Sequence, residues 1–274
     1  MSVPRLEHLA CVVVDIDEFL TKAGVNVWYE LTKQIFLKAG YTLEQAMVAV
    51  EKHKQIYGKF RDRVSNLDPI KDHAEYEAAY TEMVTGIKSL YESSGLELTR
   101  ENLADCVKKV IDENIVSYPE VKEFLDFLEE LREIKIPIIV LTGAYSLIAE
   151  ILVDQHNFVG SSAASEFNWL GELFDGFKYI SKESWSKVQG LLKLSQSMRT
   201  FVGWPENEII VFDDGKTASG IFEQAHGVQL LHPDGAPLKT AKFIGYSLYE
   251  LQAYTESILP QADFDELMAR RSND

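Results

Sequence analysis

Three short apolar runs predict strands that are buried on both faces. They cover residues 9–15, 136–142 and 208–214, are rich in Val and Ile, and each ends in a polar residue. Apolar and polar residues do not alternate within them, which is typical of strands in a parallel sheet covered by helices on both sides. A fourth strand is predicted at residues 227–231, after a short helix near residues 218–225.

Helical patterns alternate with these strands. Pro119 suits the first turn of a helix, Glu120 and Glu123 favour its positive N-terminal end, and apolar residues follow at helical spacing. Further helices are predicted at residues 146–155, 184–197 and 247–258. Alternating strands and helices predict an α/β fold with a Rossmann-like, doubly wound parallel sheet.

About a hundred residues between the first two strands carry helical rather than strand patterns. Helices are predicted near residues 25–38, 42–57, 74–91 and 100–114, and Thr42 with Gln45 forms a possible capping box for the second of them. We therefore expect two domains, an α/β core formed by residues 1–19 and 118–274 and a helical domain inserted as residues 20–117.

Composition narrows the classes of protein. The chain has 274 residues, 46% hydrophobic and 26% charged, which is an ordinary globular profile. Its 27 Lys and Arg against 43 Asp and Glu give a net charge of −16, which disfavours binding to nucleic acid or to anionic membranes. Only two cysteines, no signal-peptide pattern and no apolar run of membrane-spanning length indicate a cytoplasmic protein.

Polar side chains cluster at the predicted carboxyl ends of the strands, where open parallel sheets bind ligands. These residues are Asp15, Asp17, Thr142, Asp213 and Asp214. Carboxylates gathered at one edge would repel each other by ~4 kcal/mol per pair at 4 Å and an effective dielectric near 20. A divalent cation would relieve this repulsion, and an all-oxygen ligand set suits Mg²⁺, which in turn attracts a phosphate group.

These polar residues belong to motifs whose order along the chain is similar to that of a known family. VVVDIDEF, IIVLTG, a downstream Lys and IIVFDD resemble the four ordered motifs of the haloacid dehalogenase (HAD) superfamily of phosphohydrolases. The resemblance covers about residues 9–231. The segment FVGSSAASEFNWLGELFDG is similar to one in the phosphoserine-phosphatase-like branch. The resemblance as a whole implies the HAD fold. The inserted helices would then form a cap domain that closes over the site and selects the substrate.

The resemblance also implies roles for the residues of the first two motifs. Asp15 would be the nucleophile that forms an aspartyl-phosphate. Asp17 would be the general acid for the leaving group and then the general base for water. Thr142 and the backbone N–H of Gly143 would bind the phosphoryl oxygens.

The remaining motifs imply a metal site and a cation. Asp213 and Asp214 would hold Mg²⁺ together with Asp15 and the main-chain carbonyl of Asp17. The motif lysine would neutralise the nucleophile and the phosphate, and the chain offers Lys182 and Lys187. Lys187 is favoured because it stands at the start of the helix predicted before the fourth motif.

The sequence departs from the family at two places. Glu18 and Phe19 stand where a Gly-Thr or similar pair usually follows the second Asp, and Ala218 stands where many members keep a further Asp. Asp17 is present, although the dehalogenase branch lacks that residue, so cleavage of a carbon–halogen bond is disfavoured.

These patterns predict a Mg²⁺-dependent phosphatase that hydrolyses small phosphorylated metabolites. The alternatives are a phosphomutase, a phosphonatase that uses a cap lysine, and a degenerate, non-catalytic binding protein marked by Glu18 and Phe19. The sequence leaves the oligomeric state open, a homodimer included.

Overall fold

The computed structural model describes residues 4–21, 24–67, 72–179, 190–191, 209–214 and 219–272. Nearly all of the helix predicted at residues 184–197, together with Lys182, Lys187 and Ala218, lies outside these ranges. None of the helices within the described ranges combines the length and the apolar character needed to cross a membrane.

The described strands form one sheet in the order β4-β3-β2-β1-β5-β6-β7. The central strand β1 (Cys11–Val14) runs parallel to β2 (Ile138–Tyr145) and to β5 (Ile209–Asp213). Next to β5 lie β6 (His226–Leu230) and the short β7 (Phe243–Gly245), also parallel. The α/β fold with a mostly parallel sheet is therefore confirmed.

The other edge of the sheet differs from a purely parallel arrangement. Strand β3 (Gly160–Leu170) is parallel to β2, but β4 (Leu173–Tyr179) returns antiparallel to β3. This hairpin is formed by the segment that resembles phosphoserine phosphatases, and the hydrophobic pattern did not predict its strands.

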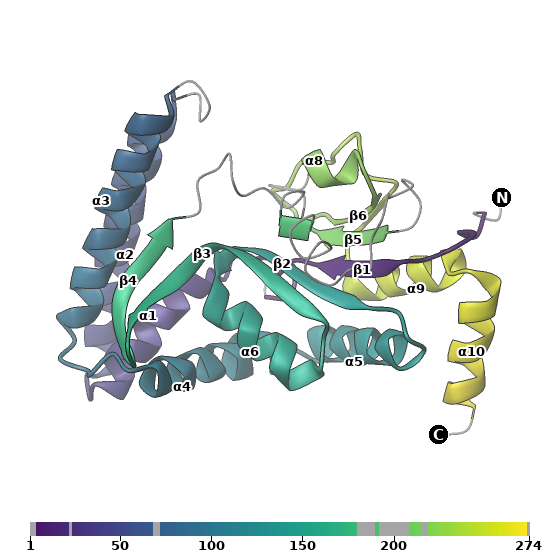
Figure 1. Ribbon diagram of the computed structural model, residues 1–274, viewed down its shortest axis with the longest axis horizontal. Coiled ribbons are helices and arrows are strands. Elements are labelled where there is room, and N and C mark those ends of the chain that lie inside the picture. Colours follow the sequence, from purple (N-terminus) through teal and green to yellow (C-terminus); the bar gives the residue numbers. More distant parts are fainter. Residues whose placement is uncertain are drawn as a thin grey trace.

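Helices cover both faces of the sheet. Val12 and Val14 of β1 pack into the larger hydrophobic cluster with α5 (Pro119–Glu133), α6 (Ser146–His156) and α9 (Leu248–Ile258). The alternate residues Cys11 and Val13 pack into a second cluster with α8 (Ser219–Phe222). Figure 1 shows α8 on the opposite side of the sheet from α5 and α6, as expected for a doubly wound fold. The chain ends in α10 (Gln261–Arg271).

Most of the described residues between β1 and α5 are helical, as predicted. They form α1 (Val27–Lys38), α2 (Leu43–Val64), α3 (His73–Glu92), α4 (Arg100–Ile111) and a π-helical turn, η1 (Asp112–Val116). The capping box of Thr42 and Gln45 is present at the start of α2.

The β3–β4 hairpin joins the sheet to these inserted helices. The hydroxyls of Tyr80 on α3 and Ser165 on β3 lie 2.6 Å apart in a buried hydrogen bond. Phe177 of β4 packs its ring against Trp28 of α1 and Tyr91 of α3, with centroids 5.1 and 6.3 Å away. Figure 1 shows the hairpin extending from the sheet, and its strand β4 packs against α3.

Candidate active site

Three buried carboxylates meet at the carboxyl end of the two central strands. Asp15 directly follows β1, Asp213 ends β5, and Asp214 is next in the chain. One carboxylate oxygen from each of the three lies within 4.8 Å of the others. The register explains the meeting, because Val14 pairs with Phe212 and the Asp15 N–H donates to the Phe212 carbonyl at 3.1 Å.

This trio fits a divalent cation. All three residues are at most 8% exposed, so water screens their mutual repulsion poorly. Each offers a hard oxygen ligand, the type that Mg²⁺ prefers. The buried Asp15, Asp213 and Asp214 therefore form a site that can hold a metal ion.

The carboxylate of Asp17 meets the start of the inserted helices instead. Asp17 is half-buried, and its Oδ1 accepts a long hydrogen bond of 3.4 Å from the N–H of Val27, the first residue of α1. The N-terminus of a helix favours a negative charge. Asp17 thus lies two residues from Asp15 with its side chain directed to the junction between sheet and cap helices.

The second motif lies one strand away, on β2. Val14 pairs with Val140, which places Thr142 one residue beyond the level of Asp15 at the same edge of the sheet. Thr142 is fully buried, and its Oγ1 accepts from the Ala144 N–H at 3.0 Å. Gly143 is exposed, with no atom within 4 Å of where a Cβ would stand.

The strand predicted to end at Thr142 continues to Tyr145. The pairing of β2 with β3 shifts between Thr142 and Tyr145, so the motif sits on an irregularity of the strand. The end of the apolar run therefore does not mark the end of the strand.

The departure at Glu18 and Phe19 has a structural explanation. Glu18 has φ of 57°, the left-handed region that glycine adopts most easily. Phe19 is buried against Phe124 and Phe212, with ring centroids 5.6 and 5.9 Å away. The Glu18 carbonyl lies 2.5 Å from His232 Nε2, so the loop is tied to the segment after β6. The unusual pair thus packs into the fold without displacing the carboxylate trio.

Gln229 is a site residue that the sequence analysis missed. It is 1% exposed, and its Nε2 donates to the carbonyls of Asp214 and Ala236 at 3.1 and 3.0 Å. Its Oε1 accepts from the Leu238 N–H at 2.8 Å. Gln229 therefore fixes the backbone of Asp214, and the signal that could have revealed it is a polar residue inside the apolar run GVQLL.

Comparisons with known proteins show which solved structures have a similar fold. No family model and no curated protein sequence matches the chain. Solved structures match over nearly its whole length. A phosphoserine phosphatase described as a phospho-aspartyl intermediate analogue has a TM-score of 0.55 at 16% identity, covering 90% of this chain and 99% of its own. The chain has the HAD fold.

Two further solved structures agree with this fold. A HAD family hydrolase from Salmonella enterica serovar Typhi has a TM-score of 0.61 at 14% identity, over 93% of this chain and 73% of its own. A phosphoserine phosphohydrolase-like protein from Francisella tularensis has a TM-score of 0.55 at 14% identity, over 90% and 99%. Within this phosphoserine-phosphatase-like HAD fold, the chain carries a buried aspartate trio.

Proposed function

We propose that the protein is a Mg²⁺-dependent phosphatase that hydrolyses a small phosphorylated metabolite through an aspartyl-phosphate on Asp15. The observation that carries this proposal is the meeting of Asp15, Asp213 and Asp214 within 4.8 Å at the carboxyl end of the sheet. In open α/β sheets this edge is the usual place for a ligand.

In the first step a carboxylate oxygen of Asp15 attacks phosphorus. A new P–O bond forms to Asp15, the P–O bond to the substrate's own oxygen breaks, and Asp17 gives its proton to that leaving oxygen. Thr142 and the Gly143 N–H are proposed to bind the non-reacting phosphoryl oxygens.

In the second step water releases the phosphate. Asp17, now a carboxylate, takes a proton from a water molecule whose oxygen attacks phosphorus. The P–O bond to Asp15 breaks, inorganic phosphate leaves, and both carboxyl groups return to their starting protonation. Two such displacements through a covalent intermediate replace one difficult displacement.

The metal ion would be held by Asp15, Asp213 and Asp214 and, as the resemblance implies, by the main-chain carbonyl of Asp17. When bound, Mg²⁺ would supply positive charge that offsets the negative charge on the transferring phosphoryl group. Lys182 or Lys187 is proposed to add a further positive charge.

Hydrolysis of phosphorylated metabolites, assayed with Mg²⁺ and with EDTA, tests the proposal. Asp15→Asn should lower kcat/KM by at least ~10³-fold, because nucleophile and metal ligand are altered together. Asp154→Asn on the exposed side of α6 is the matched control and should keep wild-type activity. Full activity in EDTA, or in Asp15→Asn, would contradict the proposed chemistry.

The acid–base role of Asp17 has its own test. Asp17→Asn should slow alkyl phosphates by about 10²-fold or more but aryl phosphates much less, because a good leaving group needs little protonation. Equal losses on both ester types would remove Asp17 from the mechanism.

The same assays separate the other candidates. A phosphomutase would return the phosphoryl group to the sugar rather than release inorganic phosphate in proportion to ester consumed. A phosphonatase would be trapped as an imine by borohydride. A binding protein would take up Mg²⁺ without turning over any ester.

A further inference from the structure

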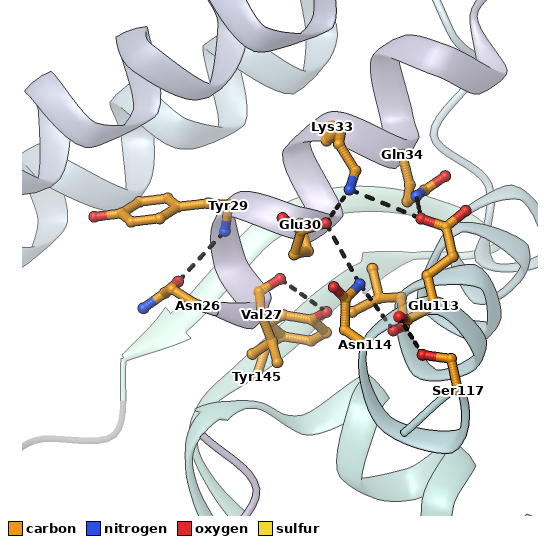
Figure 2. Close-up of polar contacts among 11 residues, drawn as sticks. Asn26, Val27, Tyr29, Glu30, Lys33, Gln34, Glu113, Asn114, Ser117 and Tyr145 are labelled. Carbon is orange, nitrogen blue, oxygen red and sulfur yellow. Dashed lines mark hydrogen bonds and ion pairs between the residues drawn. The ribbon is translucent and has the colours of Figure 1, made fainter. Parts of the chain in front are cut away.

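The first turn of α1 is bound to the loop after β1 and to strand β2 through both backbone groups of one residue. The N–H of Val27 donates to Asp17 Oδ1, and the carbonyl of Val27 accepts from the hydroxyl of Tyr145, each at 3.4 Å. Figure 2 shows Tyr145 beneath this turn with its hydroxyl directed to Val27. Val27 therefore links Asp17 to β2, the strand that carries Thr142.

Tyr145 is held rigidly in place. Its side chain is fully buried, with the ring edge-on to Trp28 at 5.2 Å and tilted over Phe167 at 5.4 Å. Burial, together with nearby Tyr91 and Asp17, raises the pKa of Tyr145 well above its ordinary value. Its hydroxyl thus stays protonated and remains a hydrogen-bond donor.

A second contact holds the same turn from the other end of the insert. Asn114 lies in the π-helical turn η1, where the cap returns to the core. Its Nδ2 donates to the Val110 carbonyl at 3.1 Å and to the Glu30 carboxylate at 3.4 Å. Glu30 belongs to the first turn of α1, so this contact ties the entry of the insert to its exit (Figure 2).

Charged groups reinforce this second contact. Lys33 pairs with Glu30 and lies 3.7 Å from Glu113, the neighbour of Asn114 in η1. Gln34 donates to the same Glu113 carboxylate at 2.7 Å. The Lys33 and Glu30 side chains are 18% and 21% exposed, so their pair is less screened than a pair on the open surface, whereas Glu113 is 52% exposed. As Figure 2 shows, Glu30, Lys33 and Gln34 of α1 all reach towards η1.

We propose that Tyr145 and Asn114 are positioning residues for Asp17. Together they hold the first turn of α1 so that the Val27 N–H fixes the plane of the Asp17 carboxyl group for proton transfer. The inference rests on the proposed function, because it gives Asp17 the acid–base role.

The long contacts at Val27 are consistent with such a role. Catalytic hydrogen bonds are often long without substrate and shorten in the reacting complex. Proton transfer by a positioned side chain supplies about 10²–10⁴-fold in rate, and that gain depends on orientation. Loosening the turn should therefore cost part of this factor, and only for substrates that need the proton.

The test is Tyr145→Phe, which removes the hydroxyl and keeps the ring. We expect kcat/KM for an alkyl phosphate to fall about tenfold, a fraction of the acid–base factor, and kcat/KM for p-nitrophenyl phosphate to stay within about twofold. The fall should lie in kcat rather than KM. Tyr91→Phe is the matched control, a fully buried tyrosine of α3, and should show no such difference between esters.

A second variant approaches the turn from the other side. Asn114→Asp replaces the amide donor with a carboxylate that cannot donate to Glu30 and repels it. It should give the same preference for aryl over alkyl esters. Equal losses on both esters in the two variants, or no loss in either, would overturn the inference.

A measurement without turnover separates this inference from the proposed function. The backbone amide resonance of Val27 should shift in Asp17→Asn, in Tyr145→Phe and in Asn114→Asp, and stay unchanged in Tyr91→Phe. Such shifts without hydrolysis of any ester by the wild type would mean that the turn positions Asp17 but the phosphatase function is wrong. Unchanged Val27 shifts in an active wild-type background would refute the positioning role alone.

Discussion

At the scale of single residues, two buried histidines make the stability of the protein sensitive to pH. His53 in α2 lies 2.6 Å from the Thr32 hydroxyl, and His226 in β6 lies 2.8 Å from the Tyr254 hydroxyl. Burial lowers the pKa of each to about 4, from an ordinary value of 6.5, with Lys242 adding to the effect at His226. The folded protein thus keeps both rings neutral at pH values where the unfolded chain protonates them.

The free energy of unfolding should therefore decrease as pH falls from 6.5 towards 4. Each histidine with a lowered folded pKa contributes up to about 1.4 kcal/mol per pH unit in that window, and nothing further above pH 6.5. Urea unfolding at pH 7, 6 and 5 would measure the slope. His53→Asn and His226→Gln each keep a nitrogen at the position of one ring nitrogen but cannot be protonated. Each variant should take up about one proton fewer on unfolding, and the slope of the free energy of unfolding against pH should decrease accordingly. An unchanged slope in both variants would show that other groups dominate.

The left-handed backbone of Glu18 predicts a gain in stability. A non-glycine residue in this region destabilises the folded state by about 1–2 kcal/mol. Glycine makes the unfolded chain more flexible, which lowers the free energy of unfolding by about 0.4–1 kcal/mol. Glu18→Gly should therefore raise the free energy of unfolding by roughly 0.5 kcal/mol. Glu18→Ala retains the strained φ and is the control. A gain as large in Glu18→Ala would mean that the side chain, not the backbone, is responsible.

At the residue scale, the sequence predicted that Asp15, Asp213 and Asp214 meet at one edge of the sheet. Asp15, Asp213 and Asp214 end or follow Val- and Ile-rich runs, and parallel pairing of those runs brings their ends together. Tyr145 and Gln229 could not be predicted as site residues, because their roles depend on partners far along the chain, Val27 and Asp214. The choice between Lys182 and Lys187 stays open, since both lie outside the described residues.

Among the elements, the β3–β4 hairpin escaped prediction for a definite reason. The buried positions of β3 are Ala163, Ser165 and Phe167, so two of these three side chains are small or polar. The hydrophobic alternation that identifies a strand is therefore weak. Most helices were predicted within a few residues, but α2 continues past residue 57 to Val64, where polar and basic residues hide the pattern. The helix α10 was missed as well.

The hydrogen bond between Tyr80 and Ser165 is expected to couple the hairpin to the cap helices. A double-mutant cycle of Tyr80→Phe and Ser165→Ala should give a coupling free energy of about 1 kcal/mol in unfolding measurements, the net value of a typical hydrogen bond. The pair Thr85→Ala and Ser165→Ala should be additive, because the Thr85 hydroxyl donates to the Thr81 carbonyl within α3, whereas the Ser165 hydroxyl bonds to Tyr80. Additivity in the first cycle would mean that the two hydroxyls do not stabilise the junction.

For the whole molecule, cap helices and sheet share one hydrophobic cluster. It contains Val27 and Tyr91 from the insert as well as Val12, Phe124 and Phe212 from the core. Aromatic rings of the hairpin bridge the two parts. The division into a core and a cap domain stays a prediction, and the shared cluster indicates that the two parts stabilise each other.

We expect the described parts to unfold together. Calorimetry should give a single transition for the wild type. Phe177→Ala removes ring contacts to Trp28, Tyr91 and Phe174, so it should destabilise the protein by about 3 kcal/mol and lower Tm while the transition remains single. Two separated transitions, with Phe177→Ala moving only one of them, would show that the cap folds independently.

The ends of the sheet also bear on how copies of the protein behave at high concentration. An exposed edge strand is a template onto which another chain can add and start aggregation. Here one outer strand, β4, has α3 packed along it, and the other, β7, is three residues long. At the start of β4, backbone groups already have partners in the described chain, because the Phe174 N–H donates to the Leu98 carbonyl and the Arg100 N–H donates to the Glu172 carbonyl. Strand-mediated self-association should therefore be slow as long as the hairpin stays docked on α3.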